Sequence, residues 1–306
     1  MKVLITGAGG QLGAALVAAA PPACALRALD RAALDITDPD AVRRAVAAFR
    51  PDWILNAAAY TAVDRAEEDR EAAFAINADA VRLLAENAAA EGARLLHVST
   101  DFVFDGCQGR PYRPEDPPRP LGVYGQSKRA GEEAALELLG EDALIVRTAW
   151  VYAATGRNFM LTMLRLMAEP GRPFVGVVAD QVGTPTSAPG LAAALWGLVR
   201  RQARGIHHWT EAGVASWYDF AVAIREEAQA LDLLRHAAPV RPLTSAEYPT
   251  PAPRAPFTVL DKSATWGVLG QAAPHWREAL RAVLAEVVVR RREARRSPAT
   301  EMPSTS

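Results

Sequence analysis

The first half of the chain alternates short apolar runs with longer alanine-rich stretches. The apolar runs predict β-strands at residues 3–5, 26–29, 53–55, 95–98 and 144–146. The stretches between them predict helices at 10–19, 39–49, 66–91 and 123–140. Such alternation predicts a parallel sheet with helices on both faces, a doubly wound α/β fold of the Rossmann type.

The second half is less regular. Helices are expected at 158–168, 190–203, 216–231 and 273–291, with proline-rich connectors at 239–256. We expect residues 1–148 to form the Rossmann domain. Residues 149–291 should form mainly a smaller, mostly helical lobe, with some segments returning to the first domain. The polar tail, 292–306, is expected to be disordered, and its arginine cluster is typical of a solvated helix end.

Composition narrows the class of protein. The 306 residues include 34 basic and 35 acidic side chains, so a net charge of −1 gives no field to recruit nucleic acid or an anionic membrane. The uncharged run at 3–26 is interrupted by glycines, which disfavours a signal or membrane helix. The only two cysteines, Cys24 and Cys107, lack metal-ligand spacing and favour reduced thiols in a cytoplasmic protein.

A glycine-rich turn follows the first predicted strand. Gly7, Gly10 and Gly13 allow a tight turn and let backbone amides approach a pyrophosphate at a helix N-terminus. Asp30 ends the second predicted strand, where an acidic residue can hold a ribose hydroxyl. The adjacent Arg31 could instead pair with a 2′-phosphate, so NADPH and NADH both remain candidate cofactors. The first domain is therefore expected to bind NAD(P).

Tyr124 and Lys128 are four residues apart at the start of a predicted helix and so share one face. A nearby ammonium would lower the pKa of a phenol and could also hold a ribose hydroxyl, which suits acid–base chemistry. Thr100 ends the fourth predicted strand, where it can hydrogen-bond a substrate oxygen that gains charge. His97, on the same apolar strand, is more typical of a satisfied core histidine than of a base or a metal ligand.

Together these features resemble the extended short-chain dehydrogenase/reductase superfamily and, within it, the dTDP-4-dehydrorhamnose reductases. The resemblance rests on five segments: 10–13 (GQLG), 56–64 (NAAAYTAVD), 99–104 (STDFVF), 147–152 (RTAWVY) and 180–186 (DQVGTPT). Epimerases and dehydratases of the superfamily usually differ from this chain in the residues around Thr100. Agreement is looser after about residue 190.

The resemblance implies that NADPH, with NADH also accepted, reduces the C4 keto group of dTDP-4-dehydro-L-rhamnose to give dTDP-L-rhamnose. It implies that Tyr124 protonates the alkoxide, Lys128 holds the nicotinamide ribose and Thr100 orients the carbonyl. Asp101 and Trp150 would line the sugar pocket together with Thr100 and Tyr124. The residues implied along the cofactor are Gly7, Gly10, Gln11, Leu12, Gly13, Asp30, Arg31, Asp35, Ile36, Ala58, Ala59, Tyr60, Thr61, Tyr124 and Lys128.

Two departures from the family pattern matter. Some members hold Mg²⁺ between subunits with glutamates, but the corresponding positions here are Ala15 and Pro189, which have no oxygen ligand to offer. No metal is therefore expected, and the protein should be a monomer or a metal-independent homodimer. The segment 254–258 (RAPFT) departs from the usual nucleotide-pocket motif, so a related nucleotide 4-keto-6-deoxysugar remains an alternative substrate. A non-catalytic regulatory subunit on the same fold is the rival of another class.

Overall fold

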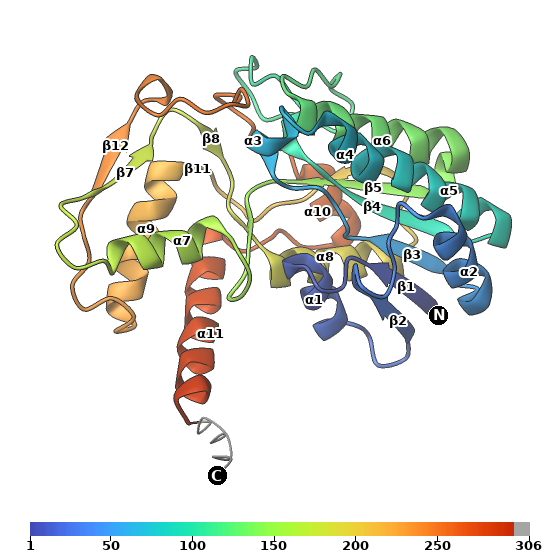
Figure 1. The fold of residues 1–306 in the computed structure, drawn as a ribbon, viewed down its shortest axis with the longest axis horizontal. Helices are drawn as coiled ribbons and strands as arrows, with labels where there is room; N and C mark the ends of the chain where they lie inside the picture. Colours follow the sequence, from blue (N-terminus) through green and yellow to red (C-terminus); the bar gives the residue numbers. More distant parts are fainter. Residues whose placement is uncertain (297–306) are drawn as a thin grey trace, which may run out of the picture.

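The computed structural model describes residues 1–296, and within them six parallel strands form one central sheet (Figure 1). Their spatial order is β10-β5-β4-β3-β1-β2. The bounds are β1 Lys2–Thr6, β2 Ala25–Leu29, β3 Trp53–Asn56, β4 Arg94–Thr100, β5 Ala143–Thr148 and β10 Gly205–His208. The first five strands lie where the apolar runs predicted them, and the doubly wound fold is confirmed. The order reverses between β1 and β3, and open α/β sheets bind ligands at such a reversal.

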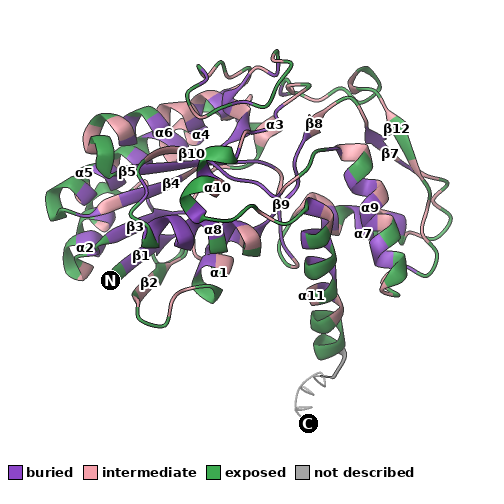
Figure 2. Cartoon of the chain, turned by 180° about the vertical axis from the view of Figure 1, so that it is seen from behind, coloured by how far each residue is buried: buried purple, intermediate pink, exposed green. Residues whose placement is uncertain are grey.

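Helices cover both faces of this sheet because successive side chains of each strand point to opposite faces. Val3 and Ile5 pack against α1 (Gln11–Ala18) and α8 (Ala188–Arg200) on one face. Leu4 packs toward α2 (Pro39–Phe49) and α5 (Ala80–Glu91) on the other, where α6 (Val123–Leu139) also lies against α5 and β4. The inner strands β1, β3, β4 and β5 are accordingly buried on both faces, whereas the edge strand β2 is partly exposed (Figure 2).

Two elements that the sequence had not indicated complete the first domain. Strand β10 pairs in parallel with β5 and extends the sheet by one strand. Helix α10 (Ser263–Leu269) packs against α8 and β10. Helix α8, the expected helix at 190–203, belongs to the same assembly, because Leu191, Leu195 and Trp196 are buried in the core of the sheet. These segments return to the first domain from the second half of the chain.

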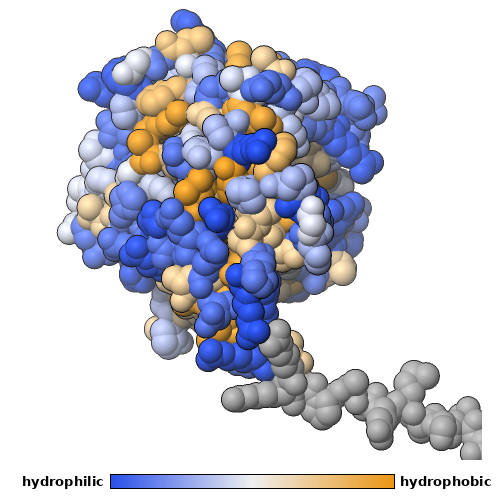
Figure 3. Space-filling model, turned by 90° about the vertical axis from the view of Figure 1, so that its left-hand side faces the viewer, coloured by the Kyte–Doolittle hydropathy of each residue, from blue (hydrophilic) through white to orange (hydrophobic). Residues whose placement is uncertain are grey.

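The remaining elements form the second lobe, at the left of Figure 1. Its core lies between α7 (Phe159–Met167), α9 (Trp217–Ala230) and α11 (Trp276–Arg296), with Met160, Phe220 and Leu284 among the buried residues. The second half of the chain also contains three small strand pairs: β7 (Val175–Val178) with β12 (Val240–Leu243), β6 (Val151–Tyr152) with β9 (Thr186–Ser187), and β8 (Val182–Gly183) with β11 (Ala215–Ser216). The surface at this end mixes hydrophilic areas with smaller hydrophobic ones (Figure 3).

Two expectations about helices need correction. Residues 292–296 continue α11 instead of starting a disordered tail, since arginine, glutamate and alanine are good helix formers; the expected tail from 297 to 306 lies outside the described residues. The single helix expected at 66–91 is divided into α3 (Val63–Ala66), α4 (Arg70–Phe74), the π-helical turn η1 (Ala75–Asp79) and α5. In η1, the Asn77 side chain turns toward Tyr60 and Ser127 and bonds to both.

Candidate active site

The predicted site residues come from loops and helix starts at the carboxyl edge of the sheet. Gly7 follows β1, Ala58 follows β3, Thr100 ends β4 and Trp150 follows β5. Because the strands are parallel, these four chain segments leave the sheet on the same side. The fold therefore brings the predicted cofactor and substrate residues to one edge.

The glycine-rich turn needs glycines because any Cβ at two of its positions would clash with neighbouring backbone atoms. Gly7 has a φ of +70°, and a Cβ there would lie 2.6 Å from the Ala58 amide nitrogen. A Cβ on Gly13 would lie 2.1 Å from the Gly7 carbonyl oxygen. The turn ends at Gly10, the N-cap of α1, which offers no side chain to cap the helix. The first-turn amides of α1 are thus left for an anionic ligand, which the helix dipole also favours.

A cleft of about 590 Å³ lies beside this helix start. It fits an anionic dinucleotide, because the uncapped amides, the exposed carboxylate of Asp30 and the exposed guanidinium of Arg31 lie along it. Of the predicted cofactor residues, it is lined by Gly7, Gly10, Asp30, Arg31, Asp35, Ile36, Ala58 and Ala59. Lining residues that the sequence reasoning missed include Leu34, Thr37, Ala72 and Ile76; helix periodicity could not assign the last two to a cofactor.

The other predicted cofactor residues have different surroundings. The Leu12 side chain is buried in the core under α1, so only its backbone can face a ligand. The Gln11 side chain reaches the second lobe, where its Oε1 accepts a hydrogen bond from Asn158 Nδ2 at 2.7 Å. Tyr60 packs with Tyr124 in a small apolar cluster, while Thr61 is exposed. None of these four side chains lines the cleft.

The start of α6 is held by a distant carboxylate. Its N-cap, Gly122, has no side chain, and Glu67 Oε1 instead accepts the Val123 amide at 2.8 Å. This contact fixes the helix one residue before Tyr124. The Tyr124 ring then meets Phe102 edge-on, with ring centroids 5.4 Å apart. Thr100, at the end of β4, donates to Asp101 Oδ1 at 3.1 Å and accepts the Phe102 amide at 3.2 Å.

The electrostatics of Tyr124 differ from the expectation. Burial raises the pKa of its phenol to about 12, and the charge of Asp101 acts in the same direction. A hydrogen bond from Thr100 opposes this rise. The expected lowering by Lys128 does not occur in this structure, because the lysine runs toward the sheet and its Nζ donates to the Val98 carbonyl oxygen at 2.7 Å. Tyr124 is therefore a protonated phenol over the neutral range.

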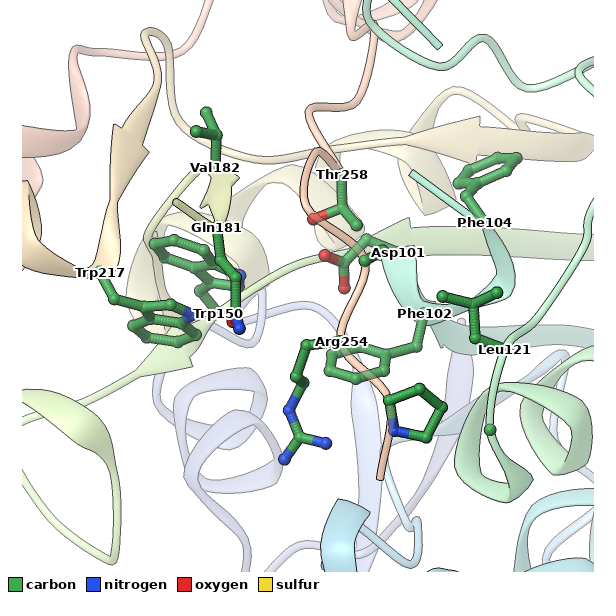
Figure 4. A pocket seen from close by; sticks show the side chains of 13 residues that line it. Asp101, Phe102, Phe104, Leu121, Trp150, Gln181, Val182, Trp217, Arg254 and Thr258 are labelled. Carbon is green, nitrogen blue, oxygen red and sulfur yellow. The ribbon is translucent and has the colours of Figure 1, made fainter. Parts of the chain in front are cut away.

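A second pocket is lined by Asp101 and Trp150, two of the four predicted sugar-binding residues, but not by Thr100 or Tyr124 (Figure 4). Burial raises the pKa of Asp101 to about 6, with hydrogen bonds from Thr258 and Thr100 opposing it. Trp150 has a left-handed φ of +48°, and its ring stacks on Trp217 with centroids 3.6 Å apart. A Cβ on Gly183 would lie 2.8 Å from the Trp150 ring, so that glycine makes room for the indole.

Eleven of the thirteen residues that line this pocket were not predicted as site residues, among them Gln181, Trp217, Arg254 and Thr258. Gln181 lies in one of the segments that carry the family resemblance, and Arg254 opens the segment that departs from the family pattern. The sequence therefore contained a signal by which Gln181 and Arg254 could have been found. Trp217 starts α9 in the second lobe, and nothing in the local sequence connects it to Trp150.

Residues 1–289 match the family model described as the RmlD substrate binding domain. The chain belongs to this family. A dTDP-4-dehydrorhamnose reductase of Mycobacterium tuberculosis is 45% identical over 98% of this chain and 97% of its own. A probable dTDP-4,6-dihydroxy-2-methyloxan-3-one 4-ketoreductase of Streptomyces antibioticus is 42% identical, with 94% and 96% covered.

The fold of a solved family member matches as well. The dTDP-4-dehydrorhamnose reductase of Bacillus anthracis, in complex with NADP, superposes with a TM-score of 0.86 at 35% identity, over 93% of this chain and 99% of that one. Among residues 1–296, no helix has both the length and the apolar composition needed to cross a membrane. In the same described part, no three His, Cys, Asp or Glu side chains gather as a metal site would require.

Proposed function

We propose that this chain catalyses the NADPH-dependent reduction of the C4 keto group of dTDP-4-dehydro-L-rhamnose, giving dTDP-L-rhamnose. The observation that carries the proposal is that Thr100, Tyr124 and the Asp101–Trp150 pocket lie at the same carboxyl edge of the sheet as the cleft of about 590 Å³. The family match over nearly the whole chain supports it. The pathway served is dTDP-rhamnose synthesis for cell-surface polysaccharide.

The cofactor residues follow from the cleft. The first-turn amides of α1 would hold the pyrophosphate, and Asp30 and Arg31, which line the cleft, would face the adenosine ribose. Asp35 and Ile36 line the same cleft near the adenine end. Arg31 favours NADPH because its guanidinium can pair with the 2′-phosphate of that cofactor. Asp30 allows NADH because its carboxylate can hold a free ribose hydroxyl. The bound nicotinamide supplies a hydride to C4; the protein contributes positioning and a proton.

Proton transfer is assigned to Tyr124. As the hydride reaches C4, the carbonyl π electrons move to O4, and the phenol proton neutralises the alkoxide that forms. The raised pKa of Tyr124 keeps that proton in place at neutral pH. Thr100 donates to O4 and so orients the carbonyl. Lys128 is assigned the nicotinamide ribose.

The sugar is assigned to the second pocket. The Asp101 carboxylate accepts hydrogen bonds from sugar hydroxyls, and the stacked Trp150 and Trp217 rings present an apolar wall to the sugar ring. Arg254 is the one cationic side chain among the residues that line this pocket, and its guanidinium lies 5.7 Å from the Phe102 ring centroid. We assign it to the diphosphate of the nucleotide.

A second candidate substrate is a related nucleotide 4-keto-6-deoxysugar. It is favoured by the 42% identity to the Streptomyces antibioticus protein, which is named for a different dTDP sugar. A purely regulatory role is less well supported, because Thr100, Tyr124 and Lys128 are all present. The unpaired thiols of Cys24 and Cys107 suit a cytoplasmic enzyme. As a partner we propose only the nucleotide sugar, with the chain acting as a monomer or a metal-independent homodimer.

The proposal is tested by following NADPH absorbance at 340 nm with dTDP-4-dehydro-L-rhamnose generated in situ. The control reaction omits the epimerase that makes this sugar and so presents only dTDP-4-dehydro-6-deoxyglucose. We expect rapid NADPH consumption in the complete reaction and little in the control. Equal rates in the two reactions would favour the second candidate substrate, a related nucleotide 4-keto-6-deoxysugar. Absence of NADPH oxidation in both reactions would reject it.

A further inference from the structure

One side chain of the glycine-rich turn reaches out of the first domain. Gln11, the first residue of α1, extends to the connector 153–158, which leads from β6 into α7 of the second lobe. Its Oε1 accepts from Asn158 Nδ2 at 2.7 Å, and its Nε2 donates to the Arg157 carbonyl oxygen at 3.3 Å. A Cβ on Gly156, where φ is +80°, would lie 3.0 Å from Gln11 Cγ. Consecutive residues of the connector therefore pack on this one side chain.

These contacts change the role expected of Gln11, which the resemblance places along the cofactor. Its backbone lies in the first turn of α1, beside the uncapped helix start. Its side chain does not line the cleft of about 590 Å³. The carboxamide instead uses both its accepting oxygen and its NH₂ group on the connector. The side chain thus holds a segment of the second lobe and leaves any cofactor contact to the backbone.

Asn158 joins this contact to α7. It is the N-cap of that helix, and its Oδ1 accepts the Leu161 amide at 3.0 Å. Its Nδ2 also donates to the Ala153 carbonyl oxygen at 2.9 Å, which closes the connector on itself. An N-cap fixes the position of the first turn of its helix. Phe159, the first residue of α7, then lies against Trp217 with ring centroids 4.7 Å apart.

Trp217 continues the series of contacts into the sugar pocket. Its ring stacks on Trp150, with centroids 3.6 Å apart, and both rings line that pocket (Figure 4). The Trp150 backbone has a φ of +48°, a conformation that a bulky residue keeps only when its surroundings hold it there. Packed side chains from Gln11 to Trp150 therefore connect the cofactor turn with the wall of the sugar pocket.

We propose that Gln11 and Asn158 are positioning residues that fix the stacked Trp150 and Trp217 rings relative to the start of α1. The inference rests on the proposed function, which assigns the cofactor to one end of this series and the sugar to the other. Hydride transfer requires the nicotinamide and C4 to be held at the correct separation and angle. The contact between Gln11 and Asn158 sets that relation through the protein, because it joins the turn that holds one ligand to the lobe that holds the other.

Two variants break the contact from opposite sides. Gln11→Met keeps the length and the helix propensity of the side chain but removes both of its hydrogen bonds. Asn158→Ser keeps a residue that caps helices well but is too short to reach Gln11. The matched controls are Gln229→Met, at an exposed position of α9, and Asn87→Ser, whose amide donates to the Leu83 carbonyl oxygen of its own helix. Because the two variants change different lobes, either one carries the test if the other does not fold.

Kinetics separate this role from direct cofactor binding. In both variants KM for the nucleotide sugar should rise about threefold to tenfold, the effect of losing a neutral hydrogen bond. The Kd for NADPH, measured by fluorescence titration, should change little. The double variant should lose no more than either single variant, because the two side chains act through one contact. A raised Kd for NADPH with an unchanged KM for the sugar would overturn the proposal, as would losses that add in the double variant.

The stacked rings can also be observed without substrate or cofactor. Two closely stacked indoles couple excitonically in far-ultraviolet circular dichroism, and the contribution of this pair is the signal that disappears in Trp217→Phe. Gln11→Met and Asn158→Ser should weaken that signal in the full-length, cofactor-free protein, while both controls keep it. An unchanged signal in both folded variants would refute the positioning role whatever the activity. A weakened signal in a protein that fails to oxidise NADPH would support the positioning and reject the proposed function.

Discussion

At the scale of a residue, burial determines the pKa of Tyr124 more than the nearby Lys128 does. Lys128 lies four residues after Tyr124 on the same face of α6, but its side chain turns toward the sheet. The pKa of the Tyr124 phenol is therefore raised by burial and not lowered by the lysine. For a reduction this is productive, since the tyrosine must deliver a proton and therefore has to hold it first.

The Tyr124→Phe variant tests the proton donor. Removing the hydroxyl while keeping the ring should lower kcat by roughly 10²–10⁴-fold, because the alkoxide loses its proton source. The dissociation constant for NADPH, measured by fluorescence titration, should change little. Tyr248→Phe, at an exposed tyrosine, is the matched control and should behave as wild type. Wild-type kcat in Tyr124→Phe would remove this residue from the mechanism.

Arg31 is the residue expected to discriminate between cofactors. Truncation in Arg31→Ala removes the cation facing the adenosine ribose, so KM for NADPH should rise by about tenfold while KM for NADH stays nearly constant. Initial rates with each cofactor, at saturating nucleotide sugar, give both constants. Arg44→Ala, on the exposed face of α2, controls for loss of surface charge. Parallel increases for both cofactors would contradict the assigned role.

The sequence could identify Tyr124, Lys128 and Thr100 because spacing and position at a strand end are local properties. It could not predict the contact between Lys128 Nζ and His97 Nε2, which lie 3.1 Å apart. That contact depends on the register that aligns Asn56 with His97 across β3 and β4, and register is a property of the sheet. Trp217 was missed for a similar reason, since only the packing of the second lobe brings it onto Trp150.

At the scale of elements, the start of α6 depends on a carboxylate from a separate helical segment. Glu67→Ala should cost about 0.5–2 kcal/mol of stability, as loss of a helix cap does, and should also lower kcat by loosening the turn that carries Tyr124. Glu67→Gln retains an accepting oxygen and should recover most of both losses. Glu68→Ala is an exposed neighbour that controls for charge. Thermal unfolding and kcat are measured together for each variant. If neither the melting temperature nor kcat changed in Glu67→Ala, the account would be contradicted.

The elements themselves were predictable to the extent that each one has a strong local pattern. Buried strands such as β1 and β4 could be predicted because each contains a continuous apolar run. β10 was missed because it is short and contains two histidines, and it becomes a strand only by pairing with β5. The helix expected at 66–91 has continuous helical propensity, and its division reflects the tertiary roles of Glu67 and Asn77, which propensity does not encode.

At the scale of the whole molecule, Glu211 connects the start of α8 to the segment that follows β10. Its carboxylate accepts the Ser187 hydroxyl at 2.6 Å and the Ser187 amide at 3.0 Å. Burial raises the pKa of Glu211 to about 7, with these hydrogen bonds opposing the rise. The folded protein therefore keeps this proton at a pH where the unfolded chain has released it.

This linkage predicts a stability that falls with pH. Below about pH 4.5 both states are protonated, and between there and pH 7 the folded state loses roughly 3 kcal/mol relative to the unfolded chain. Above pH 7 the effect is constant. Glu211→Gln should flatten the melting-temperature profile between pH 5 and 7, whereas the exposed control Glu115→Gln should not. Parallel profiles for wild type and Glu211→Gln would refute the linkage.

The central claim is that the whole assembly delivers a hydride to C4 of the nucleotide sugar. It is tested most directly by running the reaction with NADPH carrying deuterium at the transferable position of the nicotinamide. The dTDP-sugar product is then examined by mass spectrometry and proton NMR. The account predicts one deuterium per product molecule, located at C4 of dTDP-L-rhamnose. Product without deuterium, or deuterium at another ring carbon, would contradict it.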